Sequence, residues 1–114
     1  CMPRDCRIYL EDILDAVHKV RSYTAGLAKA AFIQDDKTFD AVVRNLEIIG
    51  EAAKSVPDSI RANAPGVEWK KIAGLRDILI HEYFGIDGEI VWDIVQHKLP
   101  SLETAVQRLL RELE

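Results

Sequence analysis

At 114 residues the chain has room for one compact domain, and its 48% hydrophobic and 30% charged residues are typical of a folded protein rather than a disordered one. A net charge of −4 and a pI near 5.4 count against a general nucleic-acid coat protein, but not against a locally basic site around Lys70, Lys71 and Arg76. No apolar run reaches the roughly 18 residues of a membrane span, and residues 3–7 leave no apolar signal region, so we expect a cytoplasmic protein.

The two cysteines, Cys1 and Cys6, carry no recognisable function. They lie too close in sequence to staple a domain, and no Cys/His spacing is typical of a zinc site. Met2 is typical of a natural first residue, so we expect Cys1 to be an extra residue placed before the natural start. We therefore expect one domain over residues 1–114.

Apolar residues recur at helical spacing almost throughout the chain, beginning with a first helix over residues 8–23. Asp5 is a suitable N-cap for this helix, and Gly26 is a suitable stop. A short helical piece over residues 27–33 follows and ends at Asp35-Asp36, which can cap the next element. The apolar positions of the first helix are Leu10, Ile13, Leu14, Val17 and Val20.

The next predicted helix runs from these aspartates to Pro57, because the residue before a proline is pushed out of helical geometry. Residues 58–64 favour one or two helical turns before the Pro65-Gly66 break. The apolar stripe of the long helix consists of Phe39, Val42, Val43, Leu46, Ile49, Ala53 and Val56.

A fourth main helix is predicted from about Glu68 to Tyr83, closing at Gly85. The last helical region runs from Asp87 to Glu114, with Pro100 dividing it. Alternating strand patterns are absent from the sequence. The sequence therefore predicts an all-α bundle of four to five main helices.

The fourth helix carries ionisable side chains beside its apolar residues. Arg76 falls within the apolar stripe, where burial without a partner is costly, and Tyr83 lies two turns further along the same stripe. Asp77 and His81 form an i,i+4 pair that can hydrogen-bond. On spacing alone, the structural explanation is favoured: a snorkelling arginine, a surface Asp–His pair and a packed tyrosine.

A second copy of the chain offers another explanation. In a straight helix Arg76 and His81 point about 140° apart, so one chain does not aim both side chains at one ligand. In a symmetric dimer each stripe faces its twin, and two Arg/His sets meet in one cleft. The pattern therefore predicts a homodimer with this helix near the two-fold axis.

The spacing Arg76-(four residues)-His81-Glu82-Tyr83 matches the R-x4-H-x-Y motif of the HepT-like toxins, within the HEPN superfamily. The segments RDCRIYLEDIL, RNLEIIGEAAK and HEYFGIDGEIVWDIV are similar to HepT relatives in order and spacing, so the resemblance covers almost the whole chain. The resemblance implies a helical homodimer that acts as a metal-independent endoribonuclease toxin on RNA, without a cofactor. It also implies a partner, a nucleotidyltransferase antitoxin encoded beside it.

The resemblance further implies roles for four residues. His81 would be the general acid or base, and Arg76 would bind the scissile phosphate as the ribose 2′-hydroxyl attacks. Asp77 would orient His81. Tyr83 would accept AMP from the nucleotidyltransferase, and the added bulk and negative charge would repel RNA.

Two alternatives to a toxin enzyme stay open. HEPN domains also include non-catalytic binding modules that partner a nucleotidyltransferase, and the acidic pI suits that role. A plain structural bundle is the other alternative, and it would leave Arg76 and His81 without converging partners.

The remaining polar candidates are weaker. His18 and His97 each lie alone on a predicted helix and are interpreted as surface residues. Glu47 and Glu51 form an i,i+4 pair with no second pair of ligands, so we propose no metal site.

Overall fold

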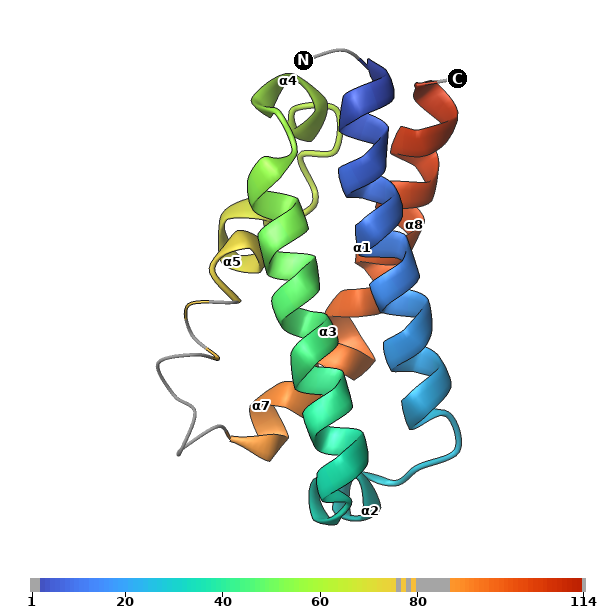
Figure 1. The fold of residues 1–114 in the computed structure, drawn as a ribbon, viewed down its shortest axis with the longest axis vertical. Helices are drawn as coiled ribbons and strands as arrows, with labels where there is room; N and C mark the ends of the chain where they lie inside the picture. The colour runs from blue at the N-terminus through green and yellow to red at the C-terminus, as the bar shows by residue number, and fades with distance from the viewer. Residues whose placement is uncertain (1–2, 76, 78, 80–86, 114) are drawn as a thin grey trace.

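The structure of the chain, a computed structural model, describes residues 3–75, 77, 79 and 87–113. Over these residues it consists of helices and their connections, without strands, which confirms the predicted all-α fold (Figure 1). None of the described helices is long and apolar enough to cross a membrane. The elements are α1 (Pro3–Thr24), α2 (Lys29–Gln34), α3 (Asp36–Ser55), α4 (Asp58–Arg61), α5 (Trp69–Ala73), α7 (Gly88–Asp93), η2 (Ile94–Lys98) and α8 (Leu99–Glu112).

The two longest helices, α1 and α3, pack antiparallel along most of their length, and α8 lies beside α1 (Figure 1). The predicted apolar stripes form the core between them, although Leu14 and Phe39 are only partly buried. Removing such stripes from water is the main favourable term in folding. The fully buried positions of the two stripes are Leu10, Ile13, Val17, Val20, Val42, Leu46, Ile49, Ala53 and Val56.

Local sequence signals explain where α1 and α3 begin and end. Asp35 caps α3 as predicted, because its carboxylate accepts hydrogen bonds from Thr38 Oγ1 (2.8 Å) and Thr38 N (3.1 Å), which lower the pKa of Asp35. Gly26 follows α1 with φ of +78°, a conformation that favours glycine. The predicted cap at Asp5 is wrong. α1 begins at Pro3, whose fixed φ and missing N–H suit a first helical position.

The predicted helix over residues 68–83 is interrupted at Gly74. α5 ends at Ala73, and Gly74 forms a turn, although its N–H still bonds the carbonyl of Lys70 at 3.1 Å. Glycine weakens a helix because it loses more backbone entropy than other residues. Helical backbone resumes at Leu75, so side-chain directions worked out for one straight helix do not carry across Gly74.

Pro100 does not divide the last helical region as predicted. α7, η2 and α8 follow one another without a break, and η2, which precedes the proline, is a π-helical turn. Proline has no N–H and its ring clashes with the carbonyl four residues earlier, so a wider turn relieves the conflict. Pro100 thereby becomes the second residue of α8, where a missing N–H costs little.

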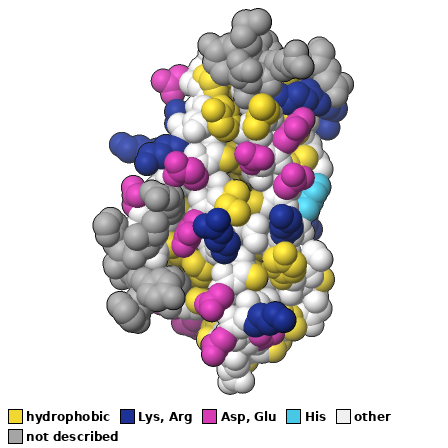
Figure 2. Space-filling model, viewed as in Figure 1, with side chains coloured by type: hydrophobic (Ala, Val, Ile, Leu, Met, Phe, Trp, Pro, Cys, Tyr) yellow, Lys and Arg dark blue, Asp and Glu magenta, His cyan; other side chains and the backbone are white. Residues whose placement is uncertain are grey.

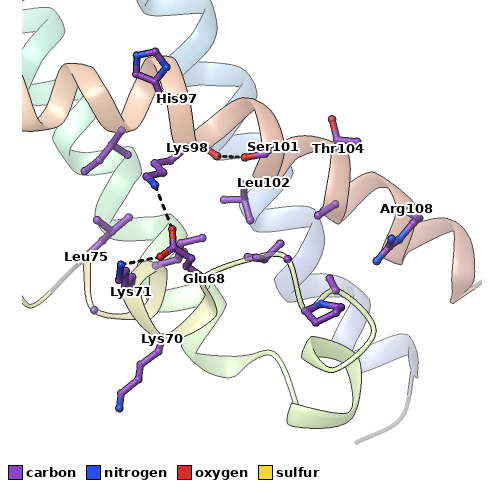
Figure 3. A pocket seen from close by; sticks show the side chains of 18 of the residues that line it. Glu68, Lys70, Lys71, Leu75, His97, Lys98, Ser101, Leu102, Thr104 and Arg108 are labelled. Carbon is purple, nitrogen blue, oxygen red and sulfur yellow. Dashed lines mark hydrogen bonds and ion pairs between the residues drawn. The ribbon is translucent and has the colours of Figure 1, made fainter.

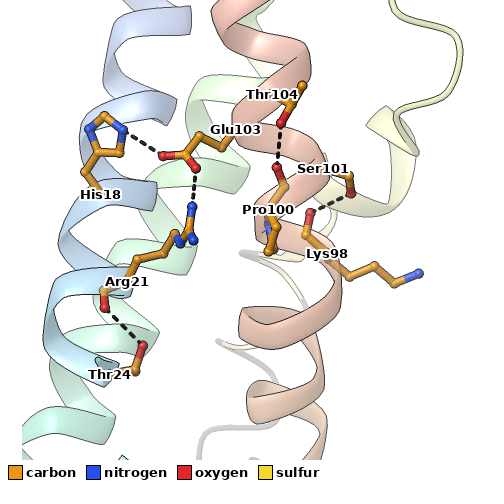
Figure 4. A network of polar contacts seen from close by, with 8 residues as sticks. All are labelled: His18, Arg21, Thr24, Lys98, Pro100, Ser101, Glu103 and Thr104. Carbon is orange, nitrogen blue, oxygen red and sulfur yellow. Dashed lines mark hydrogen bonds and ion pairs between the residues drawn. The ribbon is translucent and has the colours of Figure 1, made fainter. Parts of the chain in front are cut away.

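Glu103 of α8 joins this helix to α1 (Figure 4). Its carboxylate lies 2.7 Å from His18 Nε2 and also accepts a hydrogen bond from Arg21. The Glu103 side chain is 15% exposed, whereas His18 and Arg21 are about half exposed. His18 is therefore at the surface as predicted, but it is not alone.

An aromatic cluster fixes α7 at the other end of the molecule. Phe32 of α2 is fully buried, and its ring centroid lies 5.4 Å from that of Phe39 and 5.3 Å from that of Trp92. Gly88, the first residue of α7, lies so close to α2 that an added Cβ would come within 2.9 Å of Ile33 Cγ1. These contacts hold the start of the α7–η2–α8 segment against α2 and α3.

Replacement of Phe32 by alanine is expected to lower the free energy of unfolding by about 3–5 kcal/mol, because it leaves a cavity where three elements meet. Ile90→Ala is the matched control, since Ile90 is 59% exposed and its truncation should change stability by no more than about 0.5 kcal/mol. Urea unfolding followed by circular dichroism measures both values. Equal losses in the two variants would mean that the cluster does not anchor α7.

Candidate functional site

Of the four residues assigned to the site from the sequence, Asp77 is the one that the structure describes. Its side chain is exposed, whereas Leu75 and Leu79 on either side of it pack toward the core. Arg76, His81 and Tyr83 lie outside the described residues. The predicted contact of Asp77 with His81, and the predicted convergence of Arg76 with His81, therefore stay predictions.

A large groove borders this part of the chain (Figure 3). It has a volume of about 1270 Å³ and lies between residues 64–75 on one side and residues 94–108 on the other. Leu75 and Asp77, the sequence neighbours of Arg76, both line it. The groove is therefore lined by the two described residues that flank Arg76 in the sequence.

The first wall of the groove is held in place by Trp69. Its indole Nε1 donates a hydrogen bond to the carbonyl of Ala64 at 3.1 Å, and both residues are buried. The Pro65-Gly66 turn bulges between these two anchors, so the predicted break in the helical pattern becomes one edge of the groove. Lys70 and Lys71 then follow on the first turn of α5.

The second wall consists of the π-helical turn η2 and the start of α8. Ile94, His97 and Lys98 line the groove from η2, and Ser101, whose hydroxyl donates to the carbonyl of Lys98 at 3.2 Å, lines it from α8. π-Helical turns are rare and occur frequently at functional sites, because they redirect side chains from an ordinary helical path.

A carboxylate between two lysines bridges the two walls (Figure 3). Glu68 Oε2 lies 2.8 Å from Lys71 Nζ, and Glu68 Oε1 lies 3.2 Å from Lys98 Nζ. The hydrogen bonds from Lys71 and Lys98 hold the pKa of Glu68 below its ordinary value. The hydrogen bond to Glu68 in turn raises the pKa of Lys71. The Glu68 side chain is 46% exposed, so solvent and other ions reach this bridge.

Other polar groups of the groove differ in how firmly they are held. Arg108 of α8 donates to the carbonyl of Asn63 and approaches Glu112, so it ties α8 to the turn after α4. Lys70 is exposed and forms no ion pair with another described residue. His97 is exposed, as predicted, and lies 3.8 Å from Asp93 on its own helix.

Sequence reasoning singled out Lys70 and Lys71 but missed Glu68, Lys98 and Arg108 as neighbours of the motif. Thirty residues separate Glu68 from Lys98, and nothing in the local pattern of either residue pairs them. The Lys98-Leu99-Pro100 sequence was the available signal, since a proline inside a helical pattern forces an irregular turn.

The glutamates Glu47 and Glu51 both belong to α3. Glu47 lies 3.9 Å from Arg44 of the same helix, and Glu51 is exposed. Within the described part of the chain, no three His, Cys, Asp or Glu side chains gather as metal ligands do.

Comparison with known proteins connects this geometry to a family. The sequence profile of the family described as "Ribonuclease HepT-like" matches residues 13–109, a span that contains Arg76, His81 and Tyr83. The chain belongs to the HepT-like ribonuclease family. This finding confirms both the resemblance inferred from the motif and the prediction of a ribonuclease.

Relatives of the HepT-like chain match it from end to end. It is 42% identical over 114 residues to "Putative RNase MJ0127" of Methanocaldococcus jannaschii, covering 99% of this chain and 94% of that one. It is 40% identical over 108 residues to "Probable ribonuclease HepT" of Thermococcus cleftensis, covering 95% and 98% of the two chains. No solved structure matches the chain significantly.

The Glu68 bridge of this HepT-like protein gives a pH dependence with a definite sign. Because the pKa of Glu68 is lowered in the folded state, its stabilising contribution is complete above the ordinary value of 4.5 and is lost as pH falls through the lowered value. In Lys98→Met the pKa of Glu68, measured by NMR titration of its side-chain carboxyl carbon, should rise toward 4.5. Lys19→Met, which removes an exposed lysine of α1, should leave it unchanged, and an equal shift in both variants would contradict the bridge.

Proposed function

We propose that this chain is the toxin of a HEPN/nucleotidyltransferase toxin–antitoxin module and cleaves RNA in the cytoplasm as a metal-independent endoribonuclease. The observation that carries the proposal is the family match over residues 13–109 together with the full R-x4-H-x-Y motif inside it. The groove lined by Leu75 and Asp77, the two sequence neighbours of Arg76, adds a surface on which RNA can lie.

The chemistry needs a base, an acid and a cation. A histidine takes the proton from the ribose 2′-hydroxyl, whose oxygen attacks the adjacent phosphorus, and a second protonated group gives a proton to the departing 5′-oxygen. His81 supplies these proton transfers, since histidine has an ordinary pKa of about 6.5 and exists in both forms near neutral pH. Arg76 binds the phosphate oxygens and stabilises the charge that develops on them, and Asp77 orients His81.

This chemistry also favours a homodimer with its active site at the interface. One histidine does not easily act as base and acid on opposite sides of the same phosphorus, whereas two copies of His81 across a two-fold axis can divide the two roles. The demands of the reaction thus support the proposed dimer independently of the helical directions from which it was first inferred.

Tyr83 is the proposed point of control. A phenol oxygen can accept an AMP unit from the partner nucleotidyltransferase once that enzyme's own site activates it. The added phosphate brings negative charge two residues from His81, where it repels an incoming phosphodiester. Modification then switches off RNA cleavage without altering the helical scaffold.

Arg76→Ala and His81→Ala should each abolish toxicity in cells and lower RNA cleavage by at least about 100-fold, since each removes a group used in the transition state. Helix content measured by circular dichroism should not change. Two folded variants that remain as toxic as the unaltered chain would remove these residues from the mechanism.

A mixing experiment tests whether two histidines share one cleft. After subunit exchange with excess His81→Ala, the cleavage rate per unaltered chain should fall in proportion to the fraction of unaltered chains, because mixed dimers lack one histidine. Independent active sites would instead leave the rate per unaltered chain constant. A monomer in sedimentation at micromolar concentration would also overturn the shared cleft.

Tyr83→Phe should keep toxicity but escape neutralisation by the cognate nucleotidyltransferase, because the variant lacks the acceptor oxygen. Intact-mass analysis after co-expression should show AMP-sized increments on the unaltered chain and none on Tyr83→Phe. Tyr23→Phe is the matched control, since Tyr23 is an exposed tyrosine in the last turn of α1. If the partner fully neutralises Tyr83→Phe, the toxin is controlled by formation of the complex, and Tyr83 is not the AMP acceptor.

The same assays separate the toxin from a non-catalytic module. A module that only binds the nucleotidyltransferase would form the complex but would cleave no RNA, and His81→Ala would then have no phenotype.

A further inference from the structure

We propose that the groove between α5 and the η2–α8 segment is the track for a single-stranded part of the RNA, in which Lys70, Lys71 and Lys98 hold the phosphates. The inference rests on the proposed ribonuclease function and extends it to residues outside the R-x4-H-x-Y motif. The residues that form the proposed path of the substrate all belong to the described part of the chain.

The groove has the opposite charge to the chain as a whole. Its described lining residues include four lysine or arginine side chains and two carboxylates, which gives a net charge of +2 within a chain of net charge −4. By contrast, the face formed by α1 and α3 intersperses acidic and basic side chains (Figure 2). An anionic polymer is therefore attracted to the groove rather than to the surface in general.

Glu68 acts as the counter-ion that an incoming phosphate replaces. Lys71 and Lys98 reach this one exposed carboxylate from opposite walls, at 2.8 and 3.2 Å. Exposed ion pairs of this kind exchange partners at little cost, so a phosphate between the walls can take over both lysines. Lys70, which pairs with no other described residue, is already available.

The floor of the groove favours unpaired bases. It is formed by the apolar side chains of Val67, Ile72, Leu75, Ile94, Leu102 and Ala105. A duplex turns its bases inward, whereas a single strand can lay them on an apolar floor and stack one on an imidazole such as His97. The volume of about 1270 Å³ exceeds the range of about 300–1,000 Å³ typical of small-ligand sites, which suits a polymer segment.

The position of the groove connects binding to cleavage. Leu75 and Asp77 flank Arg76 in the sequence and both line the groove, so a strand held there passes beside the residue proposed to bind the scissile phosphate.

Binding of a fluorescent single-stranded 2′-O-methyl oligoribonucleotide tests the proposal, because the probe cannot be cleaved through its 2′-oxygen. Lys70→Ala/Lys98→Ala should weaken binding about tenfold and flatten the dependence of log affinity on log salt by about 0.7 for each lost phosphate contact. Glu68→Gln should strengthen binding about threefold, because it frees both lysines from their counter-ion. Lys19→Ala/Lys54→Ala, two exposed lysines on α1 and α3, should leave affinity within about twofold.

Opposite changes in the lysine and Glu68 variants exclude a simple loss of folding as their cause. The proposed track is wrong if Lys70→Ala/Lys98→Ala binds the probe as tightly as the control variant does. It is also wrong if Glu68→Gln does not strengthen binding. An RNA duplex that binds as tightly as the single strand would also contradict the track. So would groove variants that change the sedimentation coefficient instead of RNA binding, since the groove would then be an interface between copies of the chain.

The binding assay keeps the two proposals separate. A protein that cleaves no RNA but shows these binding changes retains the track and loses the ribonuclease assignment of His81. A protein that cleaves RNA with the same KM in the groove variants retains the ribonuclease and loses the track.

Discussion

The antiparallel contact between α1 and α3 is the constraint on which the rest of the molecule depends. Each of these helices buries one apolar stripe on the other, and the side chains at the centre of both stripes are completely removed from water. The shorter elements α2, α4 and α5 are too short to be stable helices by themselves. They form because the long pair offers a surface against which Phe32, Ile60 and Trp69 are buried.

The candidate site lies where this scaffold is least regular. On one side Gly74 interrupts the helical path between α5 and the motif, and on the other the π-helical turn η2 compensates for Pro100. An uninterrupted helix at either place would bring a regular surface of side chains together and close the space between them. The irregular turns instead leave a groove that Glu68 and Lys98 cross with a single exposed ion pair.

Periodicity predicted the long helices well because burial of a continuous stripe dominates their energetics. The α1 and α3 stripes, the Asp35 cap and the stop at Gly26 follow from residues within one helix or its ends. The interruption at Gly74 and the π turn before Pro100 were not predicted. In each case a residue that weakens the helix competes with the packing of the surrounding side chains, and the sequence does not show which effect is larger. The Glu68–Lys98 bridge could not be predicted at all, since it depends on how two separate segments meet.

The site shows the same division between local and tertiary information. The R-x4-H-x-Y spacing is local, so the sequence was sufficient to identify the family and the residues proposed to act in cleavage. The surface that guides a substrate to those residues is tertiary, because its walls come from segments about thirty residues apart.

An acidic protein can act on a polyanion when its cations are concentrated at the place of contact. At physiological salt, charges more than about 8 Å apart on the surface are largely screened, so the net charge of −4 is felt weakly inside the groove. On the proposed track an RNA strand would meet Lys70, Lys71 and Lys98, with Glu68 as an exchangeable counter-ion. The overall acidity then limits non-specific adhesion to nucleic acid, because binding requires a strand that enters the groove rather than one that touches the surface. The negative net charge that counts against a general nucleic-acid coat protein is thus compatible with the proposed RNA track, where it would favour selectivity over general affinity.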